Sequence, residues 1–211
     1  IEVFEASTKK NPGLESQYII CSEKTSDGKI WFGTDKDLTV YDPNVERFKA
    51  YKHENRSIYV TSISKSNNSV LWVSTENYGV LCFDLKSKKF KELQGLKKRK
   101  KTHLVKQINR TNLLIYAEPY YNTSEFINYN PKTNKYKSLY FHSKNGKPVI
   151  VNKFVQKTSE LILIATNQGG YSYNLNTDEL KSCYDKMEEK YGLISIKDIV
   201  LTPKKTFLAS Q

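Results

Sequence analysis

Residues 28–43 read GKIWFGTDKDLTVYDP, and residues 69–85 read SVLWVSTENYGVLCFDL. The two stretches match position by position apart from one inserted residue in the turn, and Trp31 lies 41 residues before Trp72. Two weaker copies of the same pattern follow, at residues 112–131 and 160–175. Self-similarity at a fixed spacing is the signature of a repeat architecture, so the chain is interpreted as successive units of roughly 40 to 45 residues.

Each unit reads as four short strands. An apolar run is followed by a polar turn and by a second run that ends in a small residue and usually a hydroxyl, as in Gly33-Thr34. A third run ends in an aromatic residue and an Asp or Asn, as in Tyr41-Asp42, and a fourth carries an apolar residue such as Phe48. Runs of about five residues rich in Val, Ile, Tyr and Phe between turn residues are typical of strands. Only DKMEEKY, at residues 185–191, favours a short helix.

Four short antiparallel strands in a unit of this size are typical of one blade of a β-propeller. The expected fold class is therefore all-β, a β-propeller of four-stranded antiparallel blades, either a partial propeller or a fragment of a longer array. One such sheet cannot cover both of its faces, so each blade must pack against its neighbours. Within a single region, 1–211, the expected boundaries are a blade remnant at 1–12, blades at about 13–54, 55–95, 96–141 and 142–185, and a partial blade at 186–211.

The recurring positions are expected to serve the packing of one blade on the next. Trp31 and Trp72 would place their rings between blades, each contributing about 2–3 kcal/mol by area burial. The small residue that follows lets adjacent sheets approach closely, and the Asp or Asn suits the turn after the third strand. In the third unit Glu118 stands in place of the hydroxyl. The residues at the tryptophan position of the later units are Ile115, Leu163 and Phe207.

The composition excludes a membrane-spanning helix within these residues and bears on the partners and the cysteines. The chain is 38% hydrophobic and 27% charged, and no apolar run approaches the roughly 20 residues that a membrane helix needs. A formal net charge of +12 favours acidic partners, although Lys also serves solubility. Cys21, Cys82 and Cys183 lie in apolar strand-like runs without CxxC spacing, so they are expected to be small buried hydrophobic residues rather than zinc ligands or a disulfide framework.

The first two units combine a GKIWFGT-like strand, a short turn, an LTVYDP-like strand and an FKAY-like strand. This combination resembles the two-component regulator propeller repeat, strongly over 13–52 and 58–93 and weakly over 103–140 and 151–184. Such repeats form the extracytoplasmic sensor of hybrid two-component histidine kinases of Bacteroides-type bacteria. The resemblance implies a periplasmic, non-enzymatic sensor region of a membrane-anchored parent protein. It also implies a homodimeric parent that binds a glycan-derived oligosaccharide and controls transcription, with no nucleic acid contacted by this region.

The geometry of a propeller predicts which loops lie together on the same edge of the blades. If the first strand is innermost and runs downward, the loops joining second to third strands, and each blade to the next, lie on the top edge of the blades. The remaining turns then lie on the bottom edge. Five consecutive cations at 97–101 would attract a sulfated or uronic oligosaccharide, and exposed tyrosines would stack on sugar rings. The ligand-binding candidates are Tyr78, Tyr120, Tyr121, Lys97, Lys98, Arg99, Lys100, Lys101, Asn167 and Gln168.

Other interpretations stay open. The basic run can equally be a solvated loop, and either Tyr120 or Tyr121 can pack in the core. An enzyme on the propeller scaffold, a lyase or glycan hydrolase, would need an acid/base set such as a His with a Tyr or a carboxylate. His53, His103 and His142 show no ligand spacing, and HExxH, GxSxG and glycine-rich phosphate motifs are missing. A protein or polyanion interaction platform would use the basic run. The sequence predicts no catalytic residue, metal or cofactor.

Overall fold

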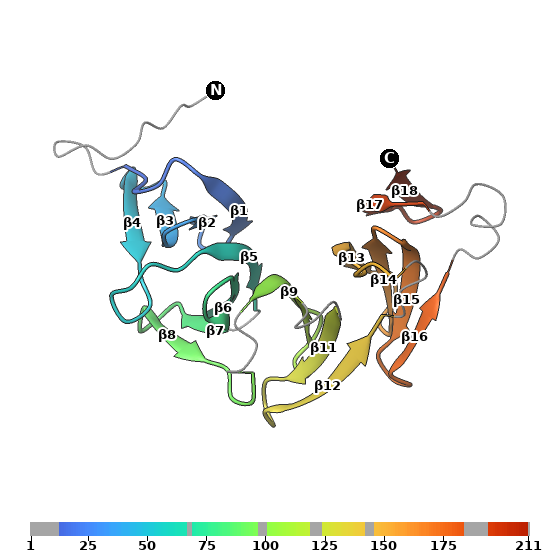
Figure 1. The fold of residues 1–211 in the computed structure, drawn as a ribbon. Coiled ribbons are helices and arrows are strands. Elements are labelled where there is room, and N and C mark those ends of the chain that lie inside the picture. Colours follow the sequence, from blue (N-terminus) through green and yellow to red (C-terminus); the bar gives the residue numbers. More distant parts are fainter. Residues whose placement is uncertain are drawn as a thin grey trace. The chain divides into compact units, whose positions relative to one another are not determined.

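The computed structural model describes residues 13–66, 69–96, 101–118, 124–141, 146–183 and 194–210. All regular elements in these ranges are β-strands (Figure 1). The helix predicted at 185–191 lies outside the described residues. Among the described residues, no helix is long and apolar enough to cross a membrane.

The strands form four four-stranded sheets, here called blades one to four, and one two-stranded sheet (Figure 1). Blade one contains β1 (Ile19–Lys24), β2 (Ile30–Thr34), β3 (Leu38–Asp42) and β4 (Arg47–Tyr51). Blade two contains β5 (Val60–Lys65), β6 (Val70–Thr75), β7 (Gly79–Asp84) and β8 (Lys89–Glu92). Blade three contains β9 (Thr102–Gln107), β10 (Leu113–Ala117), β11 (Glu125–Asn130) and β12 (Lys135–Tyr140). Blade four contains β13 (Val151–Gln156), β14 (Leu161–Thr166), β15 (Gly169–Asn174) and β16 (Glu179–Ser182). The last sheet pairs β17 (Ile196–Leu201) with β18 (Thr206–Ser210).

Within each blade the strands follow one another in chain order, and β1–β2, β2–β3 and β3–β4 pair antiparallel. This is the predicted all-β class of four-stranded antiparallel blades. The chain divides into two compact units. The first contains blades one and two and most of blade three, and the second contains blade four, the two-stranded sheet and the rest of blade three.

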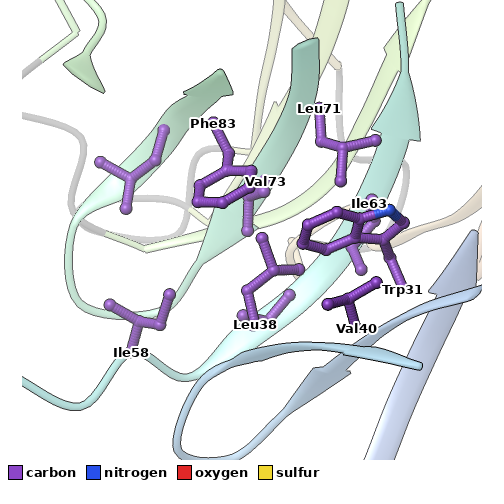
Figure 2. Packing of buried hydrophobic residues seen from close by; sticks show 10 residues of the cluster. Trp31, Leu38, Val40, Ile58, Ile63, Leu71, Val73 and Phe83 are labelled. Atoms are coloured by element: carbon purple, nitrogen blue, oxygen red, sulfur yellow. The ribbon is translucent and has the colours of Figure 1, made fainter. Parts of the chain in front are cut away.

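The predicted role of the first tryptophan is confirmed. Trp31 is 1% exposed and lies in a core cluster built from both blade one and blade two. Its ring centroid is 5.3 Å from that of Phe83 on β7, in an edge-on arrangement that aromatic pairs favour. Figure 2 shows Trp31 and Leu38 of blade one facing Phe83 and Val73 of blade two. The interface between these blades is therefore a hydrophobic core.

Trp72 repeats this arrangement one blade further on, in a cluster with Leu113, Ile115 and Tyr129 of blade three. Here the alignment of the third unit is wrong by one residue. Ile115, expected at the tryptophan position, belongs to the face of blade three that packs against blade two. Because successive side chains of a strand point to opposite faces, the equivalent of Trp72 is the buried Leu114.

In the second compact unit, Leu163 of blade four does stand at the tryptophan position. It packs with Ala165, Ile196 and Ile199 in a cluster that joins blade four to the two-stranded sheet. Polar contacts support the same junction, because Asn152 Nδ2 donates to the Ile196 carbonyl oxygen at 2.7 Å. In both compact units, residues at the tryptophan position of the repeat thus pack one sheet against the next.

The turns after the third strands also follow the repeat. In blade two, Asp84 Oδ1 accepts hydrogen bonds from the backbone N–H groups of Lys86 and Ser87 at 2.9 and 2.7 Å. Four residues after each aspartate or asparagine the backbone has positive φ, at Glu46 (51°), Lys88 (57°), Asn134 (56°) and Asp178 (56°). This left-handed conformation is unfavourable for residues with a Cβ.

Replacing Glu46 with glycine should therefore stabilise the protein. Glu46 is exposed, so the change removes the left-handed strain without opening the core. We expect the free energy of unfolding to rise by about 0.5–1 kcal/mol, measured by urea denaturation. Glu46→Ala serves as the control, because alanine keeps the Cβ. An equal gain from alanine would show that backbone strain is not the cause.

The cysteines differ more than the sequence suggested. Cys21 packs against the core cluster of Trp31, and burial raises the pKa of its thiol to about 12. Burial also raises the pKa of Cys82. Cys183 was expected to be buried as well, but it is exposed. It lies just beyond β16, the last and shortest strand of its blade, where its backbone N–H donates to the Gly170 carbonyl at 2.9 Å.

These environments predict a large difference in reactivity, because the thiolate is the reactive form. At pH 8, an alkylating reagent should modify Cys183 about a hundredfold or more faster than Cys21 in the folded protein. Mass spectrometry of peptides after timed quenching measures both rates. In urea the difference should vanish, and equal rates under native conditions would contradict the burial of Cys21.

Candidate functional site

The predicted top edge exists in the blades. In blade two, Glu76 N donates to the Tyr59 carbonyl at 3.0 Å, which ties the β6–β7 turn to the loop that leads into the blade. Glu118 N repeats this bond to the Lys101 carbonyl at 3.1 Å in blade three. The same kind of turn and the same kind of loop thus meet at one edge of blade two and of blade three. Because Glu118 and Glu76 form the same backbone hydrogen bond, the two residues are equivalent in the repeat. Ala117, and not Glu118, therefore stands at the position of the threonine hydroxyl.

A charged cluster stands on the top edge of blade three. Lys101 pairs with the Glu118 carboxylate, and His103 Nε2 lies 3.4 Å from Glu118 Oε2. The His103 ring rests on Tyr116, with ring centroids 5.8 Å apart. We call Lys101, His103 and Glu118 the Glu118 cluster. It presents one carboxylate and two nitrogen donors beside each other, a set that can exchange hydrogen bonds with several hydroxyl or acid groups.

The electrostatics of the cluster favour binding over proton transfer. The Lys101 hydrogen bond and, to a lesser extent, His103 hold the pKa of Glu118 below its usual 4.5. The Glu118 carboxylate in turn raises the pKa of Lys101 above 10.5. A general acid or base works best with a pKa near the operating pH. Both shifts move the pKa values of Glu118 and Lys101 further from 7, so both groups keep their charge at neutral pH. Such fixed charges can orient a ligand.

The cluster predicts an acid-dependent loss of stability. Because the folded-state pKa of Glu118 is lowered, its contribution is present above its usual 4.5 and is lost as pH falls through the folded-state value. The stability difference between the protein and Glu118→Gln should therefore be largest at pH 7 and shrink towards pH 3. The effect should be modest, since Glu118 is partly exposed and screened by water. Urea denaturation at both pH values measures it.

Glu54→Gln is the matched control, because Glu54 forms no ion pair within the described ranges of the chain. Its stability difference should stay constant between the two pH values. A constant difference for Glu118→Gln as well would contradict the ion pairing of Glu118.

Tyr78, a predicted candidate, lies on the top edge of blade two but packs inward. It rests against the core cluster of Trp31, and its ring meets the buried His53 ring edge-on with centroids 5.0 Å apart. His53 Nε2 lies 3.6 Å from Glu92 Oε1. These contacts leave the Tyr78 ring only partly available to a ligand.

Asn167 and Gln168 hold backbone in place. Asn167 Oδ1 accepts from Ile150 N at 2.7 Å, and Gln168 Nε2 donates to the Lys147 carbonyl at 2.7 Å. Asn77 does the same in blade two, where its Nδ2 donates to the Ser57 carbonyl at 3.0 Å. The two predicted candidates therefore order the loop before blade four in this structure.

The remaining candidates lie outside the described residues: Lys97, Lys98, Arg99, Lys100, Tyr120 and Tyr121. Of the predicted set, the structure places only Lys101 in a charged cluster. Sequence reasoning missed its partners His103 and Glu118, because strands bring them together and no short motif contains both. The signal available was their position, at the start of one strand and just after the end of the next. Within the described part of the chain, no group of three or more His, Cys, Asp or Glu residues could hold a metal ion.

Comparisons with known proteins agree with this architecture. Residues 13–36 match the family model described as "Two component regulator propeller". The extracellular domain of the putative hybrid two component system BT4673 from B. thetaiotaomicron is similar in structure, with a TM-score of 0.58 at 17% identity. That likeness covers 98% of this chain and 32% of that domain. No curated protein matches the chain in sequence.

Other solved propellers are similar as well. The AfRom2 CNH domain matches with a TM-score of 0.67 at 16% identity, over 99% of this chain and 68% of that one. The β-propeller domain of Cps50 (Swd1) from Myceliophteria_thermophila matches with a TM-score of 0.64 at 14% identity, over 93% of this chain and 63% of that one. At such identities the likeness establishes the fold alone. The structure thus consists of β-propeller blades, and residues 13–36 match the model of the two-component regulator propeller repeat.

Proposed function

We propose that the chain is part of the periplasmic sensor region of a membrane-anchored hybrid two-component system, which binds an oligosaccharide and does not catalyse a reaction. The observation that carries this proposal is the family match at 13–36, in a chain whose fold aligns over 98% of its length with a hybrid two-component extracellular domain. The chain spans only about a third of that domain, 32% of its length. The partner subunit of a homodimer and the signalling output to transcription belong to the longer protein proposed here.

The ligand is proposed to be acidic and to bind at the top edge of blade three. Lys101 is the last residue of the basic run at 97–101, so the Glu118 cluster adjoins the most cationic part of the sequence. Clustered positive charge concentrates anions near a surface. Glu118 and His103 would orient hydroxyl groups of the same ligand through hydrogen bonds. Ligand binding would then favour one of two arrangements of the sensor, by the difference in affinity between them.

Isothermal calorimetry with neutral and acidic oligosaccharides tests the proposal. We expect heat from at least one acidic oligosaccharide, a salt-dependent affinity, and a loss of about tenfold or more in Lys101→Gln or Glu118→Gln. Lys157→Gln is the matched control, because it removes one positive charge from a turn on the bottom edge. Absence of heat across a broad glycan panel would contradict the proposal.

A second candidate, an enzyme on the same scaffold, is favoured by one observation, the pairing of His103 with Glu118. The lowered pKa of Glu118 argues against it, since a weakly basic carboxylate abstracts protons poorly at neutral pH. Incubation of the chain with acidic polysaccharides, followed by size analysis of the products, separates the two functions. We expect no cleavage, and cleavage that Glu118→Gln abolishes would replace binding by catalysis.

A further inference from the structure

A pocket of about 230 Å³ opens between blades two and three, within the first compact unit. Its walls come from the end of β5, from β6, and from the β9–β10 and β11–β12 turns. These turns form the bottom edge of the blades, whereas the Glu118 cluster stands on the top edge. The pocket is smaller than the roughly 300–1,000 Å³ typical of drug-sized ligands, so it suits one small ring.

Two cations that line the pocket have no carboxylate partner among the residues that the structure describes. Arg110, in the β9–β10 turn, and Lys132, in the β11–β12 turn, are both exposed. Neither forms an ion pair with any residue in the described part of the chain. Lys65, which also lines the pocket, differs, because its Nζ lies 3.4 Å from Glu23 Oε1 and donates to the Lys24 carbonyl. The pocket therefore has two cationic groups available to an anion.

The repeat explains why a pocket exists at this interface. At the interface of blades one and two, Lys88 Nζ lies over the Trp31 ring, 5.3 Å from its centroid. The residue equivalent to Lys88 in blade three is Asn134, whose Oδ1 accepts a hydrogen bond from Tyr129 OH at 2.8 Å. Blade two has Phe83 at the position of Tyr129 and cannot form this bond. The turn residue of blade three is thus bonded to Tyr129, and Asn134 does not line the pocket beside Trp72.

Trp72 is left as part of the pocket wall, and its indole Nε1 is already occupied. It donates to Gln107 Oε1, and Gln107 Nε2 donates to the Asn109 carbonyl at 2.8 Å. These bonds fix the side chains of the wall before any ligand arrives, which lowers the entropic cost of binding. Beside them, Ile108 and Pro131 add apolar surface. The pocket thus combines a preorganised aromatic and apolar wall with two cations that are unpaired within the described ranges.

We propose that this pocket binds a carboxylated sugar ring, a hexuronate, either as the free sugar or as the end of a longer chain. The guanidinium of Arg110 can hold a carboxylate through two parallel hydrogen bonds, and Lys132 adds a second positive charge. The apolar side of the sugar ring would lie against Trp72 and Pro131. The pocket is a second site, and the inference does not rest on the proposed function of the top edge.

The two tryptophans of the chain give a direct readout. In the ¹⁵N-labelled protein they produce two indole N–H signals, and a Trp31→Phe variant identifies the signal of Trp72. Titration with glucuronate should shift the Trp72 signal along a saturable curve and leave the signal of the fully buried Trp31 in place. A tri-uronate is titrated in parallel. If both compounds bind, the free sugar is sufficient for binding. If only the trimer binds, the pocket recognises the end of a longer chain.

Variants separate the contributions. Arg110→Gln and Lys132→Gln should each weaken binding about tenfold or more, because each removes a charged donor. Ser66→Phe should abolish binding by filling the pocket without a change of charge. Lys106→Gln is the matched control, an exposed lysine of the same blade outside the pocket, and should stay within twofold.

Three results would overturn the proposal. They are a Trp72 signal that stays unmoved by both uronates at tens of millimolar, an equal shift by glucose, and an affinity that Arg110→Gln leaves unchanged. Glu118→Gln should leave this titration unaffected, so a failure of the pocket is distinguishable from a failure of the top-edge site.

Discussion

Replacing Trp31 with alanine is expected to lower the free energy of unfolding by about 3–5 kcal/mol. Trp31 is 1% exposed and fills the core between blades one and two, where it contacts Phe83 and Tyr51. Removing the indole leaves a cavity that the surrounding strands cannot close, because the antiparallel pairing of each blade fixes their positions. Urea denaturation followed by fluorescence of the remaining Trp72 measures the change.

Phe207→Ala is the matched comparison. Phe207 on β18 occupies the same repeat position, but it is 53% exposed in this structure. Its truncation should change the free energy of unfolding by only about 0.5 kcal/mol. Equal losses at Trp31 and Phe207 would show that the repeat position itself, rather than burial between blades, sets the cost.

Replacing Gly33 with alanine is the second change with a large expected effect. A Cβ at Gly33 would lie 2.4 Å from Val60 Cγ1 and 2.5 Å from Cys21 Sγ, well inside van der Waals contact. Val60 belongs to blade two, so the added methyl group pushes the two blades apart. Overpacking of this kind should cost about 1–3 kcal/mol in the free energy of unfolding.

The cause can be isolated by removing the groups that collide. In a Cys21→Ala/Val60→Ala background, the nearest remaining contact of the new Cβ is Val60 Cβ, at 3.0 Å. Gly33→Ala should then cost less than half as much as in the unmodified chain, a coupling that a double-mutant cycle detects. A cost that is the same in both backgrounds would contradict close approach of the blades at Gly33.

The fold was predictable from the sequence because its determinants are local and recur. Trp31, Gly33 and the aspartates after the third strands each do in the structure what their repeat position indicates. The third unit has neither tryptophan nor a glycine-threonine pair, so its alignment had no fixed point. A slip of one residue there exchanged the two faces of β10 and misassigned both Ile115 and Glu118.

The sites were less predictable, because they depend on contacts between residues far apart in the chain. The Glu118 cluster joins residues at the start of β9 to a residue just after β10, and the walls of the pocket come from blades two and three. Asn167 and Gln168 are polar residues in a turn, which from sequence alone look available for a ligand. Only the structure shows that their amides bond to the backbone of the preceding loop.

The central claim is that successive four-stranded blades pack on one another through the tryptophan position of the repeat. A nuclear Overhauser spectrum of the protein with labelled aromatic residues tests it most directly. The account predicts cross-peaks between the Trp31 indole protons and the ring protons of Phe83, whose ring centroids are 5.3 Å apart. Cross-peaks from Trp31 only to residues of its own sheet, with none to Phe83, would contradict it.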